Sequence, residues 1–126
     1  MSLRTPLARA RGLGSAKEGV EHWWMQRLTA IALLPLTLWF VFSIALLAGA
    51  DGAQAQAWVA FPMNAIMLSV WVVALFHHSQ LGLQVVLEDY VHHEGLKIAS
   101  LILIKFTHFV AGAAAIFAIL KIAFTA

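Results

Sequence analysis

The sequence contains no cysteine and few charged residues. Without cysteine, the chain itself can form no disulfide bond, no thiolate zinc site and no iron–sulfur ligation. Charged side chains make up 11% of the 126 residues, whereas a soluble domain carries about 25%. Hydrophobic residues account for 62%, and the mean hydropathy is +0.85. These values predict that most of the chain lies in a lipid bilayer.

Acidic residues are missing from the start of the chain. Residues 1–27 contain no acid before Glu18, and their basic residues are Arg4, Arg9, Arg11, Lys17 and Arg27. Gly12, Gly14 and Gly19 disfavour a helix over most of this stretch. An organellar presequence is Arg-rich and acid-poor in the same way. We favour a basic cytoplasmic tail that obeys the positive-inside rule. The net charge of +2 is too small to indicate a nucleic-acid partner.

Three apolar runs follow the tail, at about residues 28–49, 57–87 and 98–124. Since about 20 apolar residues span a bilayer core, each run is long enough to cross it. We therefore expect an all-α integral membrane protein with three transmembrane helices in a single domain, residues 1–126. Pro35 lies inside the first run, and proline can kink a membrane helix because it lacks a backbone donor.

The basic residues also predict how the chain is oriented. The loop after the first apolar run contains no lysine or arginine, and the loop after the second contains Lys97. By the positive-inside rule, the N-terminus and the second loop lie on the cytoplasmic or matrix side, and the C-terminus lies on the opposite side.

Two adjacent histidines, His77 and His78, fall inside the second run. Ionisable residues at this depth are costly and mark functional sites, although a neutral imidazole can also bond a neighbouring helix. At about 100° per residue, His78 shares a helix face with Gly82 and Asp89. The glycine leaves room either for a flat cofactor or for another helix. His78 is thus a candidate axial haem ligand, and His77, about 100° away, cannot bind the same iron.

Asp89 and Tyr90 end the second run, about 16 Å along the helix axis from His78. A helix over this run exceeds the hydrocarbon thickness, so its end is expected to emerge from the lipid. A phenol can donate a hydrogen bond to a quinone carbonyl, and an adjacent carboxylate can orient a polar network or relay protons. The alternative is an interfacial tyrosine beside a solvated aspartate.

The other polar residues near the runs have less specific meanings. Arg27 opens the first run, where its guanidinium could bind a carboxylate such as a haem propionate or could simply set the topology. His108 is expected to be satisfied by another helix. Lys105 and Lys121 are expected to extend toward the interfaces.

Two segments resemble the small hydrophobic membrane-anchor subunit, of D type, of succinate dehydrogenase (complex II). One runs from His78 through Gly82 to the sequence Asp89-Tyr90-Val91, and the other is the head of the first helix, residues 27–31. The resemblance covers most of the chain: basic tail, three helices, and the motif that ends the second helix.

This resemblance implies roles for four residues. His78 would be one axial ligand of a haem b, with the second histidine supplied by another membrane subunit, and spacing favours it over His77. Arg27 would lie near the haem propionates. Tyr90 would hydrogen-bond ubiquinone, and Asp89 would support that site. In bacterial relatives a histidine lies slightly before this arginine, and here His22 is displaced by one position from the place of that histidine.

The resemblance also implies partners. A flavoprotein subunit with FAD would oxidise succinate, and an iron–sulfur subunit would carry electrons to ubiquinone. A second membrane subunit, a cytochrome b, would complete the helical bundle. The chain would then be a subunit of a succinate:quinone oxidoreductase, without catalysis of its own, in a bacterial plasma membrane or alternatively the mitochondrial inner membrane. The competing hypotheses are an anchor of another quinone-linked complex, such as fumarate reductase, and a cofactor-free helical protein.

Overall fold

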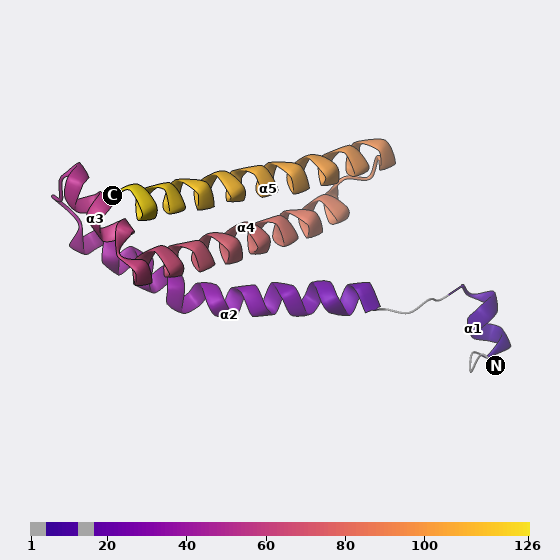
Figure 1. Ribbon diagram of the computed structural model, residues 1–126. Helices are drawn as coiled ribbons and strands as arrows, with labels where there is room; N and C mark the ends of the chain where they lie inside the picture. The colour runs from indigo at the N-terminus through magenta and orange to yellow at the C-terminus, as the bar shows by residue number, and fades with distance from the viewer. Residues whose placement is uncertain (1–4, 13–16) are drawn as a thin grey trace.

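The computed structural model describes residues 5–12 and 17–126, apart from the side chains of residues 8, 17 and 18. All regular structure in these ranges is helical (Figure 1), in the order α1 (Pro6–Ala10), α2 (Lys17–Leu46), α3 (Gly52–Ala60), α4 (Pro62–Tyr90) and α5 (Glu94–Thr125). The predicted all-α fold is confirmed.

Three helices are long and apolar enough to cross a membrane, and they span Gly19–Leu46, Pro62–Tyr90 and Glu94–Thr125. At 1.5 Å per residue they are about 42 to 48 Å long, against about 30 Å of hydrocarbon. The expected three spans are confirmed, and each helix has turns to spare beyond the lipid core.

The first long helix begins earlier and ends sooner than the predicted range 28–49. It starts at Lys17 despite Gly19, because one glycine costs only about 1 kcal/mol and a long cooperative helix absorbs that cost. It ends at Leu46, and Gly49 follows with φ +90°, a left-handed conformation that favours glycine after a helix end.

The second predicted helix, residues 57–87, was wrong at its start. Ala57–Ala60 belong to α3, a separate helix whose first turn is capped reciprocally by Asp51 and Gln54. The chain then breaks at Phe61, which is extended (φ −62°, ψ 123°), and α4 begins at Pro62. A residue before proline avoids helical geometry, and proline suits the first helical position, so this pair separates the helices.

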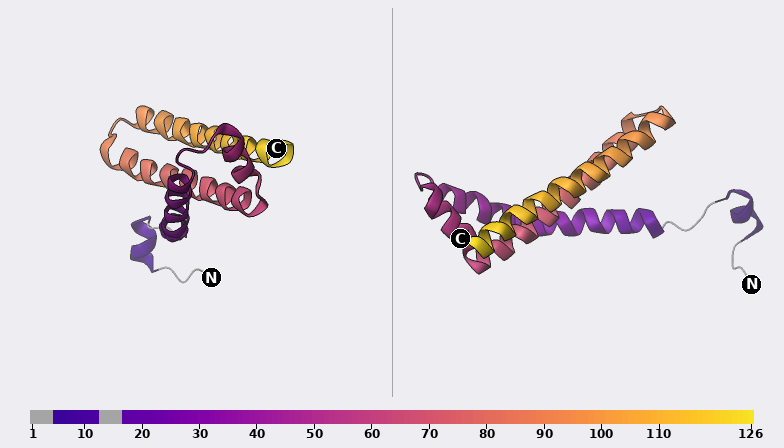
Figure 2. Two further views of the ribbon diagram at one scale, coloured as in Figure 1. Left: turned by 90° about the vertical axis from the view of Figure 1, so that its left-hand side faces the viewer. Right: turned by 45° about the horizontal axis from the view of Figure 1, so that its top comes forward.

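Helix α4 is the middle member of the bundle. It packs against α5 on one side and α2 on the other, whereas α2 and α5 do not contact each other within the described residues. Figure 1 and the left view of Figure 2 show the same order. Among the side chains that the structure describes, the buried hydrophobic ones are all on α4 and are Ala65, Leu68, Val72, Ala74 and Leu81. The three long helices therefore form an open layer.

Aromatic contacts join α2 to α4 on the side nearer α3. Phe40 stacks on Trp71 with 4.1 Å between ring centroids, and Trp71 Nε1 donates to Thr37 Oγ1 at 3.0 Å. Pro35 lies just before this cluster, inside α2, and the α2 ribbon changes direction along its length (Figures 1 and 2). Such a bend is the usual effect of a proline in a helix.

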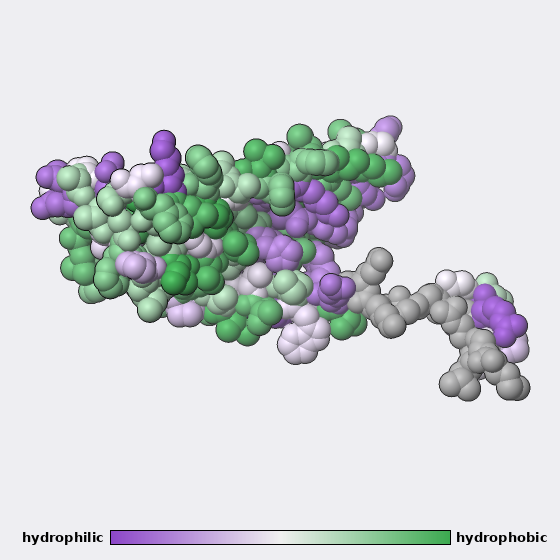
Figure 3. All heavy atoms as spheres, viewed as in Figure 1, coloured by the Kyte–Doolittle hydropathy of each residue, from purple (hydrophilic) through white to green (hydrophobic). Residues whose placement is uncertain are grey.

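Most of the surface is apolar, as expected for helices that face lipid. Figure 3 shows hydrophobic side chains over the helices and hydrophilic ones at the ends. Hydrophilic surface also continues between α2 and the α4–α5 pair, where the helices diverge toward the N-terminal end of α2. The polar residues in this gap form the candidate site.

Candidate functional site

His78 lies on the face of α4 that packs against α2. Its Nδ1 is 3.0 Å from Oγ1 of Thr29, which belongs to α2 and is only 7% exposed. The imidazole itself is half-buried. Its other nitrogen, Nε2, makes no hydrogen bond to any described residue, and it is not among the fully buried polar atoms. His78 thus has one nitrogen held by a neighbouring helix and the other available.

Gly82, one turn beyond His78, also faces α2. A methyl group at this position would lie 3.7 Å from Nε2 of Gln26, an ordinary van der Waals distance. Sequence reasoning left open whether the glycine admits a flat cofactor or a helix. Within this chain, it is α2 that approaches the glycine.

Two polar atoms on the same face of α2 lack partners. Nε2 of His22 and Oε1 of Gln26 are buried without a hydrogen bond among the described residues. Because His22, Gln26 and Thr29 are four and three residues apart, they form one stripe along the helix. Buried polar atoms are normally satisfied, so this stripe is suited to meet a polar group from outside the chain.

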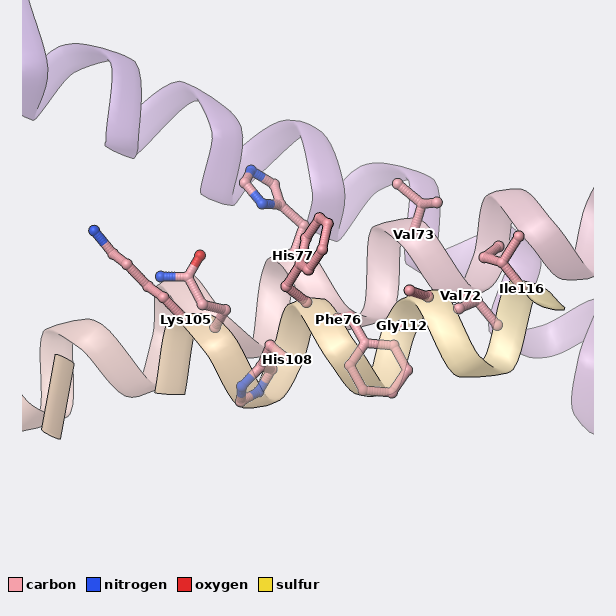
Figure 4. A pocket seen from close by; sticks show the side chains of 11 residues that line it. Val72, Val73, Phe76, His77, Lys105, His108, Gly112 and Ile116 are labelled. Atoms are coloured by element: carbon pink, nitrogen blue, oxygen red, sulfur yellow. The ribbon is translucent and has the colours of Figure 1, made fainter. Parts of the chain in front are cut away.

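His77 borders two pockets, one on each side of α4. It lines a cavity of about 390 Å³ between α4 and α5, together with Gln80, Lys105 and His108 (Figure 4). The remainder of the lining is mainly apolar, as with Phe76. His77 also lines a second pocket, between α4 and α2, together with Met25 and Thr29. It thus lies at the junction of the three helices, whereas His78 hydrogen-bonds Thr29 directly.

His108 is satisfied by hydrogen bonds, as expected. Its Nε2 lies 3.1 Å from Oγ of Ser79 on α4, and its Nδ1 lies 2.8 Å from the carbonyl oxygen of Ile104 in its own helix. A carbonyl only accepts, so Nδ1 carries the proton and Nε2 accepts from the serine hydroxyl. Both ring nitrogens are used, which makes His108 a helix-packing residue.

Arg27 is exposed near the polar stripe of α2. Its guanidinium carbon lies 5.3 Å from the ring centroid of Trp23, a cation–π contact. It forms no ion pair in the part of the chain that the structure describes. The guanidinium is free to bind an anionic group through two parallel hydrogen bonds.

Asp89 and Tyr90 lie in the last turn of α4, away from His78. Both are exposed, Tyr90 to 78%, and neither hydrogen-bonds to another described residue. Because α2 and α4 run in opposite directions, this end of α4 and the head of α2 lie at the same end of the bundle (Figure 1). The structure does not bring the phenol and the imidazole together, since Tyr90 is about 18 Å from His78 along the helix.

The comparisons with known proteins concern nearly the whole chain. Residues 1–120 match the family model described as succinate dehydrogenase/fumarate reductase transmembrane subunit. The chain belongs to this family. No solved structure matches it.

Relatives within this family carry closely similar names. The succinate dehydrogenase hydrophobic membrane anchor subunit of Rickettsia bellii is 35% identical over 103 residues, which are 81% of this chain and 82% of the relative. The succinate dehydrogenase membrane anchor subunit of Reclinomonas americana is 36% identical over 71% of this chain and 77% of its own. The Paracoccus denitrificans anchor subunit is 34% identical over 68% and 67%. The resemblance noted in the sequence is confirmed.

The geometry of His78 fits what a haem would require of a protein ligand. No group of three or more histidines or acids is placed to hold a metal ion within residues 5–12 and 17–126. Haem iron needs no such group, since the macrocycle supplies four nitrogens and the protein only axial ligands. A single imidazole with a free Nε2 satisfies that requirement from this chain.

Sequence reasoning missed a ladder of polar side chains on α4. Gln80 Nε2 donates to Gln84 Oε1 at 3.3 Å, and Gln84 Nε2 donates to Glu88 Oε1 at 2.9 Å. The ladder begins near the histidines and ends beside Asp89. Its spacing of four residues, a signal of side chains that meet on a helix, could have predicted it.

Proposed function

We propose that this chain is a membrane-anchor subunit of a succinate dehydrogenase, where it helps to hold a haem b and forms part of the site at which ubiquinone is reduced. The names of the relatives support the enzyme. The observation that carries the haem is the arrangement of His78, whose Nδ1 bonds Thr29 while Nε2 stays free.

His78 would contribute one axial ligand through Nε2. A bound haem would supply a one-electron carrier to the complex. The second ligand would come from the partner cytochrome b subunit, across the open side of the α2–α4 pair. Arg27 is exposed and has no ion pair among the described residues, so it can bind a propionate near the head of α2.

Tyr90 and Asp89 would act at the quinone. The exposed phenol can donate a hydrogen bond to a quinone carbonyl, while its ring remains in apolar surroundings. The neighbouring carboxylate can orient that donor or relay a proton. Both groups lie at the end of the bundle from which the basic tail extends. Placing this end on the cytoplasmic side puts Tyr90 and Asp89 where an iron–sulfur subunit would dock.

The partners follow from the same assignment. A flavoprotein subunit with FAD and an iron–sulfur subunit would deliver electrons from succinate. The second membrane subunit would cover the faces of α2 and α5 that do not pack against α4. Among the residues that the structure describes, α5 has no buried side chain at all, so most of its surface is available to that subunit and to lipid. The proposed location is a bacterial plasma membrane with the N-terminus cytoplasmic, and the alternative is the mitochondrial inner membrane.

The test is a reduced-minus-oxidised optical spectrum of the gently solubilised native complex. We expect His78→Ala to lose the b-type spectrum while the subunits still co-purify. His77→Ala is the matched control, because it removes the adjacent imidazole, which does not hydrogen-bond Thr29. A spectrum that survives His78→Ala and disappears in His77→Ala would assign the ligand to the other histidine. A wild-type complex with no haem spectrum would refute the haem role and leave the quinone site.

Fumarate reductase remains the second candidate, because the matched family includes transmembrane subunits of both enzymes. The two differ in reaction direction, which depends on the potentials of the quinone and the cofactors. Rates of succinate oxidation with ubiquinone and of fumarate reduction with a reduced quinol, measured on the same complex, separate them.

A further inference from the structure

We propose that Thr29 fixes the protonation pattern and the ring orientation of His78, so that Nε2 presents its lone pair to the haem iron. Thr29 would be a positioning residue, acting through His78 without touching the cofactor. The inference rests on the proposed haem role of His78.

The hydroxyl of Thr29 has a single hydrogen atom. Its Oγ1 lies 2.7 Å from the carbonyl oxygen of Met25, one turn earlier in α2, and 3.2 Å from that of Gln26. A helical threonine commonly donates to the carbonyl four residues before it. A carbonyl can only accept, so these short contacts use the hydroxyl hydrogen.

The remaining contact of Oγ1 is with Nδ1 of His78 at 3.0 Å. Because the hydroxyl hydrogen is already directed at Met25, Oγ1 must accept here and Nδ1 must carry a proton. A neutral imidazole has only one N–H, so Nε2 is unprotonated. This assignment comes from the hydrogen-bond network, and it is the tautomer that metal coordination through Nε2 requires.

The surroundings make the pairing hard to replace. Thr29 is only 7% exposed where it lies between two helices, so little water can reach Nδ1 in its place. When the far ring nitrogen donates a hydrogen bond, the coordinating imidazole also becomes more basic. A more basic ligand favours ferric over ferrous iron, so the hydroxyl is expected to lower the haem potential.

The experiment compares Thr29→Val with Thr29→Ser in the whole complex. Valine keeps the shape and removes the acceptor, whereas serine keeps the hydroxyl. We expect Thr29→Val to weaken haem retention by about 10- to 100-fold, as for other partners of metal-bound histidine. Its remaining haem should have a higher midpoint potential and an altered low-spin electron paramagnetic resonance signal. In Thr29→Ser, haem retention, the midpoint potential and the resonance signal should stay close to those of the wild type.

Thr37→Val is the matched control. Thr37 also lies on α2 and bonds α4, through Trp71, but it does not contact His78. An equal change of potential and resonance signal in Thr37→Val would mean that loosened helix packing, and not the tautomer, is responsible, and would overturn the inference. If Thr29→Val does not assemble, Thr29→Ala removes the same acceptor with a smaller side chain.

The outcomes separate this inference from the proposed function. Loss of haem in His78→Ala together with wild-type potential and resonance signal in Thr29→Val would refute the role of Thr29 alone. Retention of haem in His78→Ala would refute the ligand assignment itself, whatever the Thr29 variants do.

Discussion

Gly82 offers a sharp test of where the cofactor lies relative to α2. The glycine is one turn from His78, and sequence reasoning allowed it to admit either a haem or a helix. In the structure a Cβ here would meet only Nε2 of Gln26 within 4 Å, at 3.7 Å. We therefore expect Gly82→Ala to assemble normally and to retain haem.

The magnitudes follow from that contact. Alanine is favoured over glycine in a helix interior by about 1 kcal/mol, and an added methyl at ordinary contact distance costs little. Gly82→Ala should thus be neutral or stabilising by up to about 1 kcal/mol. Leucine is larger and has to displace Gln26 and α2, an overpacking that costs about 1–3 kcal/mol. Gly82→Leu should separate Thr29 from His78 and release haem more readily.

The assay is haem content per assembled complex, with thermal release of haem as the measure of stability. Gly112→Ala is the matched control, because a Cβ at Gly112 would lie 3.6 Å from Phe76 in the α4–α5 contact. Loss of haem in Gly82→Ala, with an assembled complex and a normal Gly112→Ala, would refute this reasoning. It would mean that the glycine makes room for the cofactor itself.

Three further predictions concern other parts of the molecule. Tyr90→Phe should lower quinone reduction, while succinate oxidation with an artificial acceptor and the haem spectrum stay unchanged. Equal quinone reductase rates in the variant and the wild type would exclude a role of the phenol at the quinone. Arg27→Ala should weaken haem retention, with Arg27→Lys restoring it only in part because an ammonium lacks the two-pronged geometry; equal haem content in all three proteins would contradict a propionate role. Trp71→Phe should lower the stability of the complex by about 1 kcal/mol in thermal unfolding, since it removes the bond to Thr37 but keeps an aromatic ring.

The number of helices could be predicted from hydropathy alone, because a bilayer sets the length of an apolar run. The helix boundaries could not be predicted from hydropathy, because they depend on individual capping and proline residues that a hydropathy average does not register. Phe61 and Pro62 are apolar and were absorbed into a longer helix, although proline at this position starts a new one. The reciprocal cap between Asp51 and Gln54 was equally readable from the sequence.

Features of the candidate site could be predicted within a single helix, but contacts between helices could not. The helix period predicts that His77 and His78 point about 100° apart. In the structure His78 hydrogen-bonds Thr29, and His77 borders the cavity beside α5 as well as a pocket beside α2. The partner of His78 was not predictable in this way, because Thr29 is 49 residues away and meets it only through the packing of α2 on α4. Thr29 entered the sequence interpretation as part of a motif, without a physical role.

The contact between Thr29 and His78 depends on the register of two helices. A slip of one residue moves a side chain by about 1.5 Å and rotates it by about 100°, which would end the 3.0 Å contact. Two features hold the register from opposite sides: the stacked Trp71 toward α3, and Gly82, where α2 approaches α4, on the side of the basic tail. Gly82→Leu, which displaces α2, is therefore expected to act on the haem through the distance between Oγ1 and Nδ1, without any contact with the cofactor. Gly82→Ala and Trp71→Phe keep the helix contact and the stacked ring, so both are expected to preserve the register.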